Sequence, residues 1–177
     1  VLFRSRDLVE METLIDDTLA FLRAGDSAET AAPTRLDALV EGVADDIAAL
    51  GADIEVEGRL SQPVVLRPVQ TRRALVNLMD NARRYGGGRV TVRLSEAGGR
   101  ARVDIEDAGP GIPEAEMERV FEPYVRLEAS RARHTGGSGL GLAIARAIAR
   151  AQGGDITLSR RAEGGLRASF SLPLARG

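Results

Sequence analysis

The stretch GGSGLGL, Gly136–Leu142, is a glycine-dense loop that runs directly into a strongly helical segment, Leu142–Ala151. Closely spaced glycines remove the Cβ atoms that would keep a ligand away from the backbone. The helix that follows offers free N–H groups and the positive end of its dipole to an anion. The combination indicates a phosphate site. Taken alone, a glycine-rich turn that only caps a helix explains the stretch equally well.

The segments before and after this loop alternate between helical and strand-like patterns. Helices are predicted over residues 7–23, 36–50, 69–85, 114–120 and 140–151, and strands over 54–56, 63–66, 89–94, 101–106, 155–159 and 168–172. Helices interspersed with hairpins, rather than strict strand–helix alternation, indicate an α/β two-layer sandwich with a mixed β-sheet. The polar segment 127–139 is predicted to be a solvated loop.

Composition narrows the chemistry. The 177 residues suit one ordinary domain with a short appendage, and with 3% aromatics and no Trp the core must consist mostly of Ala, Val, Leu and Ile. The absence of Cys excludes disulfides, thiolate metal sites and cysteine nucleophiles. All 24 basic residues are Arg, which excludes a Walker-type lysine, and the net charge of −2 gives no global attraction to nucleic acid.

The first helix carries an apolar seam. Its apolar or small residues are spaced 3-4-3-4, at Leu8, Met11, Ile15, Thr18 and Leu22. A single amphipathic helix needs a partner to bury such a stripe, so we expect a dimer or hairpin partner; the alternative is packing on its own domain. The polar segment GDSAETAAP, residues 25–33, is the best candidate for a domain boundary. It divides the chain into a helix (1–24), a linker (25–34) and a main domain (35–177).

The chain opens on Val1 rather than Met, and its first helix has no preceding loop or cap, so we expect it to be the C-terminal piece of a longer protein. Residues 1–5, VLFRS, also resemble a translated sequencing adapter and are left out of the fold prediction. No apolar run approaches the roughly 20 residues of a membrane span.

The long helix over 69–85 holds two candidate ligands. Asn77 and Asn81 are four residues apart and project from one face, with Arg84 and Tyr85 one turn further on. An Asn oxygen suits Mg²⁺, which takes phosphate oxygens as further ligands. The alternative is that both asparagines cap or bridge neighbouring loops.

Asp107 ends a predicted strand just before Gly109 and Gly111. A carboxylate there can accept a hydrogen bond from an exocyclic amine, while the glycines let the backbone approach a flat ring. A turn aspartate without a ligand is the common alternative.

Four segments match one family in order and spacing. They are NLMDNARRY (77–85), DAGPGI (107–112), FEPYVR (121–126) and GGSGLGL (136–142), which resemble the N box, first glycine box, F box and second glycine box of bacterial sensor histidine kinases. The resemblance runs from about residue 6 to the end of the chain. These kinases belong to an ATP-binding group that also contains gyrase, the Hsp90 chaperones and the MutL mismatch-repair proteins. NARRYG and FEPYVR look most similar to the osmoregulatory sensor kinases.

The resemblance implies a Bergerat-type ATP-binding fold, with helices on one face of the sheet, and ATP and Mg²⁺ as cofactors. Asn81 would ligate Mg²⁺, Asn77 would support the triphosphate and metal, and Arg84 would contact phosphate. Tyr85 would stack on adenine, whose amino group Asp107 would read. The nucleotide would further be bound by Gly109, Gly111, Ile112, Phe121, Gly137, Ser138, Gly139, Leu140, Gly141 and Leu142, with Phe121 and Tyr124 anchoring an ATP lid.

One position separates the chemistries within the group. Its ATPase members carry a Glu one turn before the metal-binding Asn, whereas this chain has Asn77, an amide that cannot act as a base. The resemblance therefore implies transfer of the γ-phosphoryl group to a histidine, with Asn77, Asn81 and Arg84 as the catalytic set and little hydrolysis.

The acceptor histidine is expected to lie outside this chain. The one histidine, His134, falls in the presumed lid and is better interpreted as a phosphate contact or surface residue than as a nucleophile. Residues 7–23 resemble the second helix of a dimerisation hairpin whose first helix carries the acceptor. We expect the chain to bind ATP·Mg without labelling itself.

The resemblance also implies partners and location. The implied partners are a second copy of the chain, bound through the hairpin helix, and a response-regulator receiver domain, with no nucleic acid. The implied location is a cytoplasmic domain of a full-length protein that reaches the bacterial inner membrane through upstream segments. Two other functions remain open: a nucleotide-dependent module that supports response-regulator dephosphorylation, and a serine-directed kinase of the anti-sigma type.

Overall fold

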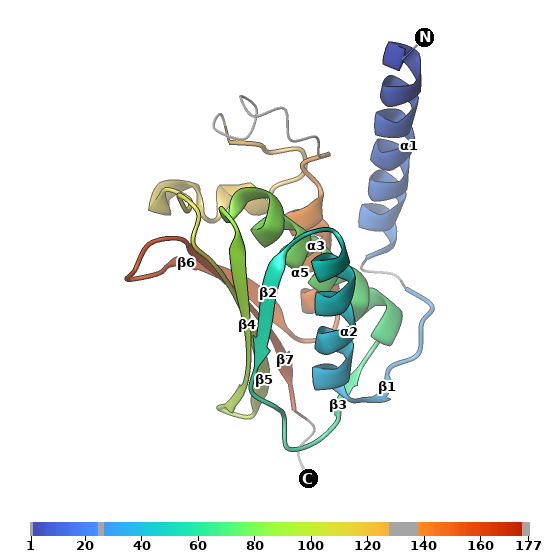
Figure 1. The fold of residues 1–177 in the computed structure, drawn as a ribbon. Coiled ribbons are helices and arrows are strands. Elements are labelled where there is room, and N and C mark those ends of the chain that lie inside the picture. The colour runs from blue at the N-terminus through green and yellow to red at the C-terminus, as the bar shows by residue number, and fades with distance from the viewer. Residues whose placement is uncertain (1, 25–26, 128–137, 175–177) are drawn as a thin grey trace.

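A computed structural model describes residues 2–24, 27–127 and 138–174. Its main sheet has five strands in the order β2 (Asp53–Glu57), β4 (Arg89–Ala97), β5 (Arg100–Asp107), β7 (Leu166–Pro173) and β6 (Asp155–Arg160). β2 and β4 run parallel and the other neighbours are antiparallel, so the sheet is mixed, and β2 and β6 form its two edges (Figure 1).

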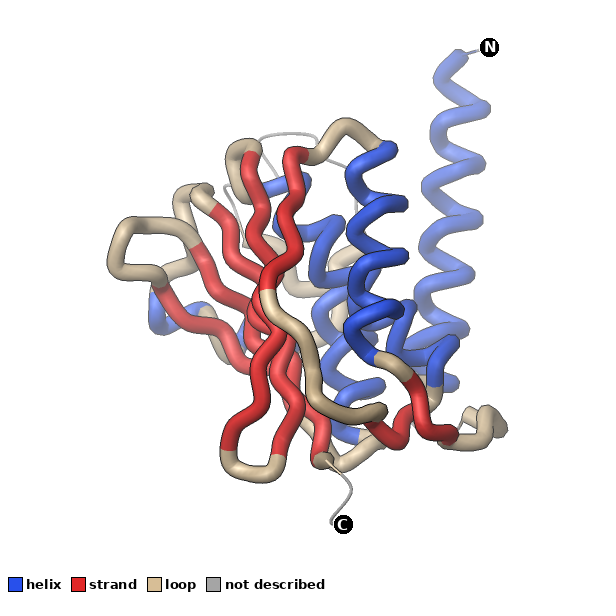
Figure 2. The backbone as a smooth tube through the Cα atoms, turned by 60° about the horizontal axis from the view of Figure 1, so that its bottom comes forward, coloured by secondary structure: helices blue, strands red, loops and turns tan. Residues whose placement is uncertain are grey.

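Three helices cover one face of this sheet: α2 (Leu36–Ala49), α3 (Pro68–Tyr85) and α5 (Gly141–Arg150). Figure 2 shows them side by side on one face, and none of the three covers the other face. The predicted α/β two-layer sandwich is thus confirmed. Between the layers, the core is aliphatic apart from Phe170 and Phe121, as the composition predicted.

Helix α3 is closed at both ends. Pro68 opens it with a backbone angle suited to a first turn, and the N–H groups of Val69 and Gln70 donate to the Glu29 carboxylate at 2.7 and 3.0 Å. Glu29 lies in the segment predicted as a linker, so that segment caps the helix from about forty residues away. The helix ends at Gly86, whose N–H donates to the Ala82 carbonyl at 2.7 Å.

Two local predictions differ from the structure. The last residues of the predicted linker form a strand, β1 (Ala32–Thr34), which pairs antiparallel with β3 (Val64–Leu66). Three residues carry too little alternation to predict a strand; the pairing partner supplies it. The domain limits 1–24, 25–34 and 35–177 themselves stay a prediction.

The single helix predicted over 114–120 is wrong. The segment forms two 3₁₀ turns, η1 (Glu114–Glu116) and η2 (Arg119–Phe121), with i→i+3 bonds from Met117 to Glu114 and from Phe121 to Glu118. Seven residues after a proline are too few to offset the cost of helix nucleation, so tighter turns form instead. Most of the predicted polar loop 127–139 lies outside the described residues.

The first helix, α1 (Leu2–Arg23), extends away from the sandwich with its N-terminus far from it (Figures 1 and 2). Leu8, Met11, Ile15 and Leu22 are 59, 59, 56 and 69% exposed. Within residues 2–24, 27–127 and 138–174, nothing covers this stripe; only the C-terminal end packs, through Ala20 and Ala24 and against α5. None of the described helices is both long and apolar enough to cross a bilayer.

Candidate functional site

One of the two candidate asparagines of α3, Asn77, lies at the start of α5. The buried side of α3, which includes Leu75, Leu78 and Met79, fixes the rotation of the helix and leaves Asn77 and Asn81 half-buried at its edge. A Cβ built on Gly141 would lie 3.8 Å from Asn77 Cγ and 3.9 Å from its Oδ1. The amide of Asn77 therefore lies in contact with the first residue of α5, which joins the predicted N box to the second glycine box.

The Asn77 side chain has an unused donor. Its Nδ2 atom is buried and has no hydrogen-bond partner among the described residues. A buried donor without an acceptor costs about 1–3 kcal/mol, so such an atom is usually satisfied by a ligand or water. An oxygen-rich ligand at the N-terminus of α5 would supply the acceptor.

Asp107 lies in a cluster of glycines at the end of β5. It is 7% exposed, and its Oδ1 accepts hydrogen bonds from the N–H groups of Gly109 at 2.9 Å and Leu166 at 3.2 Å. A Cβ on Gly86 would lie 2.4 Å from Asp107 Cβ, and one on Gly109 would lie 2.4 Å from the Tyr85 carbonyl oxygen. The turn aspartate that was the alternative interpretation of Asp107 is therefore present in the structure. The turn places the carboxyl group next to the end of α3.

Glu106 and three arginines hold the end of β5 in place. The Glu106 side chain is 2% exposed and pairs with Arg93, Arg161 and Arg167, while Arg161 Nη1 also donates to the Asp107 carbonyl at 2.7 Å. Burial opposes ionisation of Glu106, but the hydrogen bonds from Arg167 and Arg93 outweigh it and lower the pKa. Sequence reasoning missed this cluster; an acidic residue in a strand with arginines at paired positions was its only signal.

The predicted phosphate contact, Arg84, is already paired within α3. Its Nε lies 2.6 Å from Asp80 Oδ2, and Arg83 Nη2 lies 2.7 Å from Asp80 Oδ1. The Arg84 side chain is 38% exposed, so a stronger anion can compete for it. Sequence reasoning passed over Asp80, although an acid four residues before an arginine on a helix is a recognisable signal.

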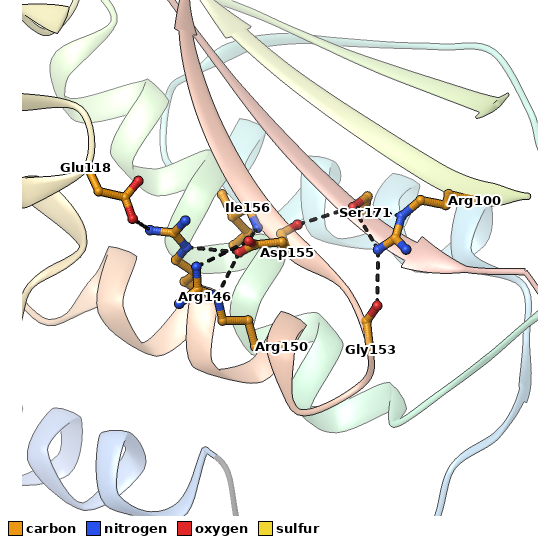
Figure 3. A network of polar contacts seen from close by, with 8 residues as sticks. All are labelled: Arg100, Glu118, Arg146, Arg150, Gly153, Asp155, Ile156 and Ser171. Carbon is orange, nitrogen blue, oxygen red and sulfur yellow. Dashed lines mark hydrogen bonds and ion pairs between the residues drawn. The ribbon is translucent and has the colours of Figure 1, made fainter. Parts of the chain in front are cut away.

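Phe121 of the F box is buried, and its ring contacts an arginine of α5. The Arg146 guanidinium carbon is 4.2 Å from the centre of its ring. Arg146 also pairs with Glu118 and with Asp155 Oδ1 at 2.9 Å, as Figure 3 shows. Sequence reasoning missed Arg146, whose signal was an arginine inside an otherwise apolar helix pattern.

Asp155 anchors this network at the start of β6. Its burial opposes ionisation, but hydrogen bonds from Arg146, Arg150 and the Ile156 N–H lower its pKa to about 2. The network ties η2 and α5 to the sheet, so it fixes the position of Phe121 relative to α5.

The second glycine box is described from Ser138 onward; Gly136, Gly137 and His134 lie outside the described residues. Gly139 has φ +74°, and a Cβ there would lie 3.0 Å from Tyr124 backbone atoms. The Tyr124 N–H donates to the Gly139 carbonyl at 3.0 Å, so the end of the F box and the second glycine box are joined. Leu140 is fully buried and α5 begins at Gly141 with Leu142 half-buried, which confirms the predicted helix start.

Gly111 and Ile112 complete the first glycine box. Gly111 has φ +72°, and a Cβ there would lie 3.2 Å from the Gly165 carbonyl oxygen; Ile112 is half-buried. In the described ranges no group of three or more His, Cys, Asp and Glu side chains is placed to hold a metal ion. A Mg²⁺ ion at this site would thus depend on amide oxygens such as that of Asn81 and on phosphate oxygens of a ligand, which fits the donor set.

The family model for histidine kinase-, DNA gyrase B-, and HSP90-like ATPases matches residues 67–176. The sensor histidine kinase GtrS of Pseudomonas aeruginosa is 39% identical over 168 residues, which cover 95% of this chain and 34% of the relative. The sensor protein RstB of Escherichia coli is 50% identical over 102 residues, 58% of this chain and 24% of the relative. The chain therefore spans about a third or less of these relatives.

Solved structures share the fold. Full-length ShkA in complex with AMPPNP superposes with a TM-score of 0.79 at 28% identity, over 98% of this chain and 37% of that one. The mycobacterial sensor histidine kinase MprB superposes with a TM-score of 0.71 at 28% identity, over 84% of this chain and 100% of that one. The narrower likeness to osmoregulatory kinases stays a prediction.

Proposed function

The chain belongs to the family of histidine kinase-, DNA gyrase B- and HSP90-like ATPases, and from that premise we propose that it is the ATP·Mg-binding catalytic domain of a sensor histidine kinase. In this proposal it transfers the γ-phosphoryl group of ATP to a histidine on a dimerisation hairpin, for relay to a response regulator. The observation that carries the proposal is the buried, unpartnered Asn77 Nδ2 beside Gly141 at the N-terminus of α5.

The described residues supply two walls for a nucleotide. At one, Asp107 lies among the tightly packed Gly86 and Gly109, and in this proposal its carboxylate would accept a hydrogen bond from the amino group of the base. At the other, Asn77 and the free N–H groups at the start of α5 face the phosphates. Asn81 would hold Mg²⁺, which when bound neutralises charge on the phosphates.

The residues of α3 favour transfer over hydrolysis. Asn77 cannot take a proton from water, and the acid nearest to it on the same helix, Asp80, pairs with Arg83 and Arg84. Without a base, water attack is slow, and catalysis reduces to positioning and charge neutralisation. A histidine imidazole needs less help, because it is already a nucleophile near neutral pH.

The open stripe of α1 supports the proposed partners. Its exposed Leu8, Met11, Ile15 and Leu22 fit a homodimer through a helical hairpin, of which α1 would be the second helix. The acceptor histidine, a response-regulator receiver domain and any membrane segment would then belong to other parts of the full protein or to other chains, and this domain would lie in the cytoplasm.

The test is phosphoryl transfer from radiolabelled ATP·Mg to a separately supplied dimerisation hairpin that carries the acceptor histidine. We expect labelling of the added hairpin and none of the chain itself. Asn81→Ala should lower the rate about a hundredfold or more, because the metal loses a ligand, while Gln62→Ala, an exposed amide, should not change it.

Two outcomes would contradict the proposal. ATP binding without transfer to the hairpin would favour the regulatory module that supports dephosphorylation. Labelling of a serine-bearing protein substrate in place of the hairpin would favour the anti-sigma type of kinase.

A further inference from the structure

Helix α1 contacts the second glycine box through Asp17 and the F box through Thr18. Ser138 Oγ donates to Asp17 Oδ2 at 2.5 Å, and the Thr18 and Tyr124 hydroxyl oxygens are 3.5 Å apart. Ser138 Oγ also accepts a hydrogen bond from the Leu140 N–H at 3.2 Å. One hydroxyl group therefore links a carboxylate of α1 to the residue that precedes α5.

The residues that receive these contacts have little freedom. Tyr124 has φ +65°, which non-glycine residues rarely adopt, and its N–H is bonded to Gly139. Gly139 itself has φ +74° and is packed against Tyr124. A shift of α1 that moves Ser138 or Tyr124 must therefore move the other as well.

The rest of the α1 interface is small. Ala20 and Ala24 are 6 and 2% exposed and pack in the last turns, whereas the apolar stripe nearer the N-terminus is open. The helix is thus held to the domain at one end only, and the loss of a few contacts would release it.

The charge of Asp17 conflicts with a bound triphosphate. Its carboxylate is held through Ser138 at the end of α5 where the dipole and free N–H groups favour an anion. A phosphate bound there places like charge beside the carboxylate, and two such charges at short range repel. Nucleotide binding and the Asp17–Ser138 contact therefore weaken each other.

We propose that Asp17 is a positioning residue that makes docking of α1 compete with binding of the triphosphate. The carboxylate holds Ser138, and with it the start of α5, in the arrangement seen here; phosphate charge weakens that contact, and release of α1 in turn favours the nucleotide. The coupling is reciprocal, as for any pair of linked sites. This inference rests on the proposed function, because it needs phosphates at the second glycine box.

The experiment compares the affinities of ATP·Mg and of adenosine, which has no phosphate, by calorimetry. Asp17→Asn keeps the shape and removes the charge, so it should tighten ATP·Mg about threefold to tenfold and leave adenosine unchanged. Asp17→Glu keeps the charge and should remain within twofold of the unmodified chain. Glu12→Gln, an exposed acid one turn earlier on α1, is the matched control and should change neither affinity.

A second measurement follows the helix itself. ATP·Mg should increase amide hydrogen exchange over Leu19–Arg23 in the unmodified chain, and this increase should shrink in Asp17→Asn. The coupling would be overturned if the ratio of the ATP·Mg affinity to the adenosine affinity were equal in the unmodified chain and in Asp17→Asn. Weaker ATP·Mg binding by Asp17→Asn would also overturn it, and either result would leave the proposed function intact. Failure of the unmodified chain to bind ATP·Mg at all would instead overturn the proposed function.

Discussion

Helices α1 and α3 both carry a stripe of apolar residues, but one stripe is exposed and the other is buried. In α3, of 18 residues, Ala74, Leu75 and Met79 are 0% exposed. In α1, of 22 residues, Leu8, Ile15 and Leu22 are more than half exposed. Periodicity thus predicts a stripe but not what covers it; the sheet and α5 cover the stripe of α3, and nothing described here covers that of α1.

The difference matters for function. A helix fixed on one face and at both ends can hold Asn77 and Asn81 in a defined direction. A helix attached only at its last turns can move relative to the domain. Asn77, Asn81 and Arg84 lie on the fixed helix, whereas Asp17, whose contact we propose to be sensitive to nucleotide, lies on the loosely held one.

The largest expected effect comes from truncating the two stripes in turn. Leu75→Ala should destabilise the chain by about 2–5 kcal/mol, because it leaves a cavity between α3 and the sheet. Ile15→Ala, on the open stripe, should change the free energy of unfolding by less than about 0.5 kcal/mol at concentrations where the chain is monomeric. Urea denaturation of both variants measures this; equal losses would contradict the comparison.

A smaller effect is expected at the C-terminal end of α3. A Cβ on Gly86 would lie 2.2 Å from the Ala82 carbonyl oxygen and 2.4 Å from Asp107 Cβ, so Gly86→Ala should cost about 1–3 kcal/mol. Gly42→Ala, inside α2 with open space around it, should instead stabilise by about 0.5–1 kcal/mol. Thermal unfolding of the Gly86→Ala and Gly42→Ala variants measures this difference. Stabilisation by both substitutions would refute the close packing of α3 on Asp107.

The smallest expected effect concerns α5, the helix that α3 packs against. Because the folded pKa of Asp155 is lowered to about 2 from an ordinary 3.8, its stabilisation is present above about pH 4 and is lost as the pH falls toward 2. The side chain is 38% exposed, so solvent screening reduces this contribution to about 1 kcal/mol. Asp155→Asn should flatten the acid limb of the stability profile over that window; an unchanged limb would show that the Arg146 network contributes nothing there.

The sequence predicted the features that local patterns encode. The periodicity of α3, the strand that ends at Asp107 and the start of α5 all appear within about one residue of the prediction, because backbone preference and the facing of side chains are local properties. The two 3₁₀ turns differ from prediction because a seven-residue segment is decided by its neighbours.

Long-range polar contacts were beyond the sequence. The Asp17–Ser138 pair spans 121 positions and the Glu29 cap of α3 spans 40, and neither has a local signature. The contact of Arg146 with the Phe121 ring also has no local signature, because only the packing of α5 on η2 brings the two side chains together. The stripe of α1 was predicted, but its periodicity does not say what covers it.

The edge strand β2 has a consequence for how the domain behaves at high concentration. Its residues alternate, with Asp53, Glu55 and Glu57 exposed and Ile54 and Val56 half-buried. Glu55 and Glu57 pair with Arg89 and Arg93 of β4, so a strand added at this edge would have to pack beside a row of charged side chains, which opposes strand addition. The sheet therefore resists intermolecular β-pairing and aggregation at this edge without any covering element.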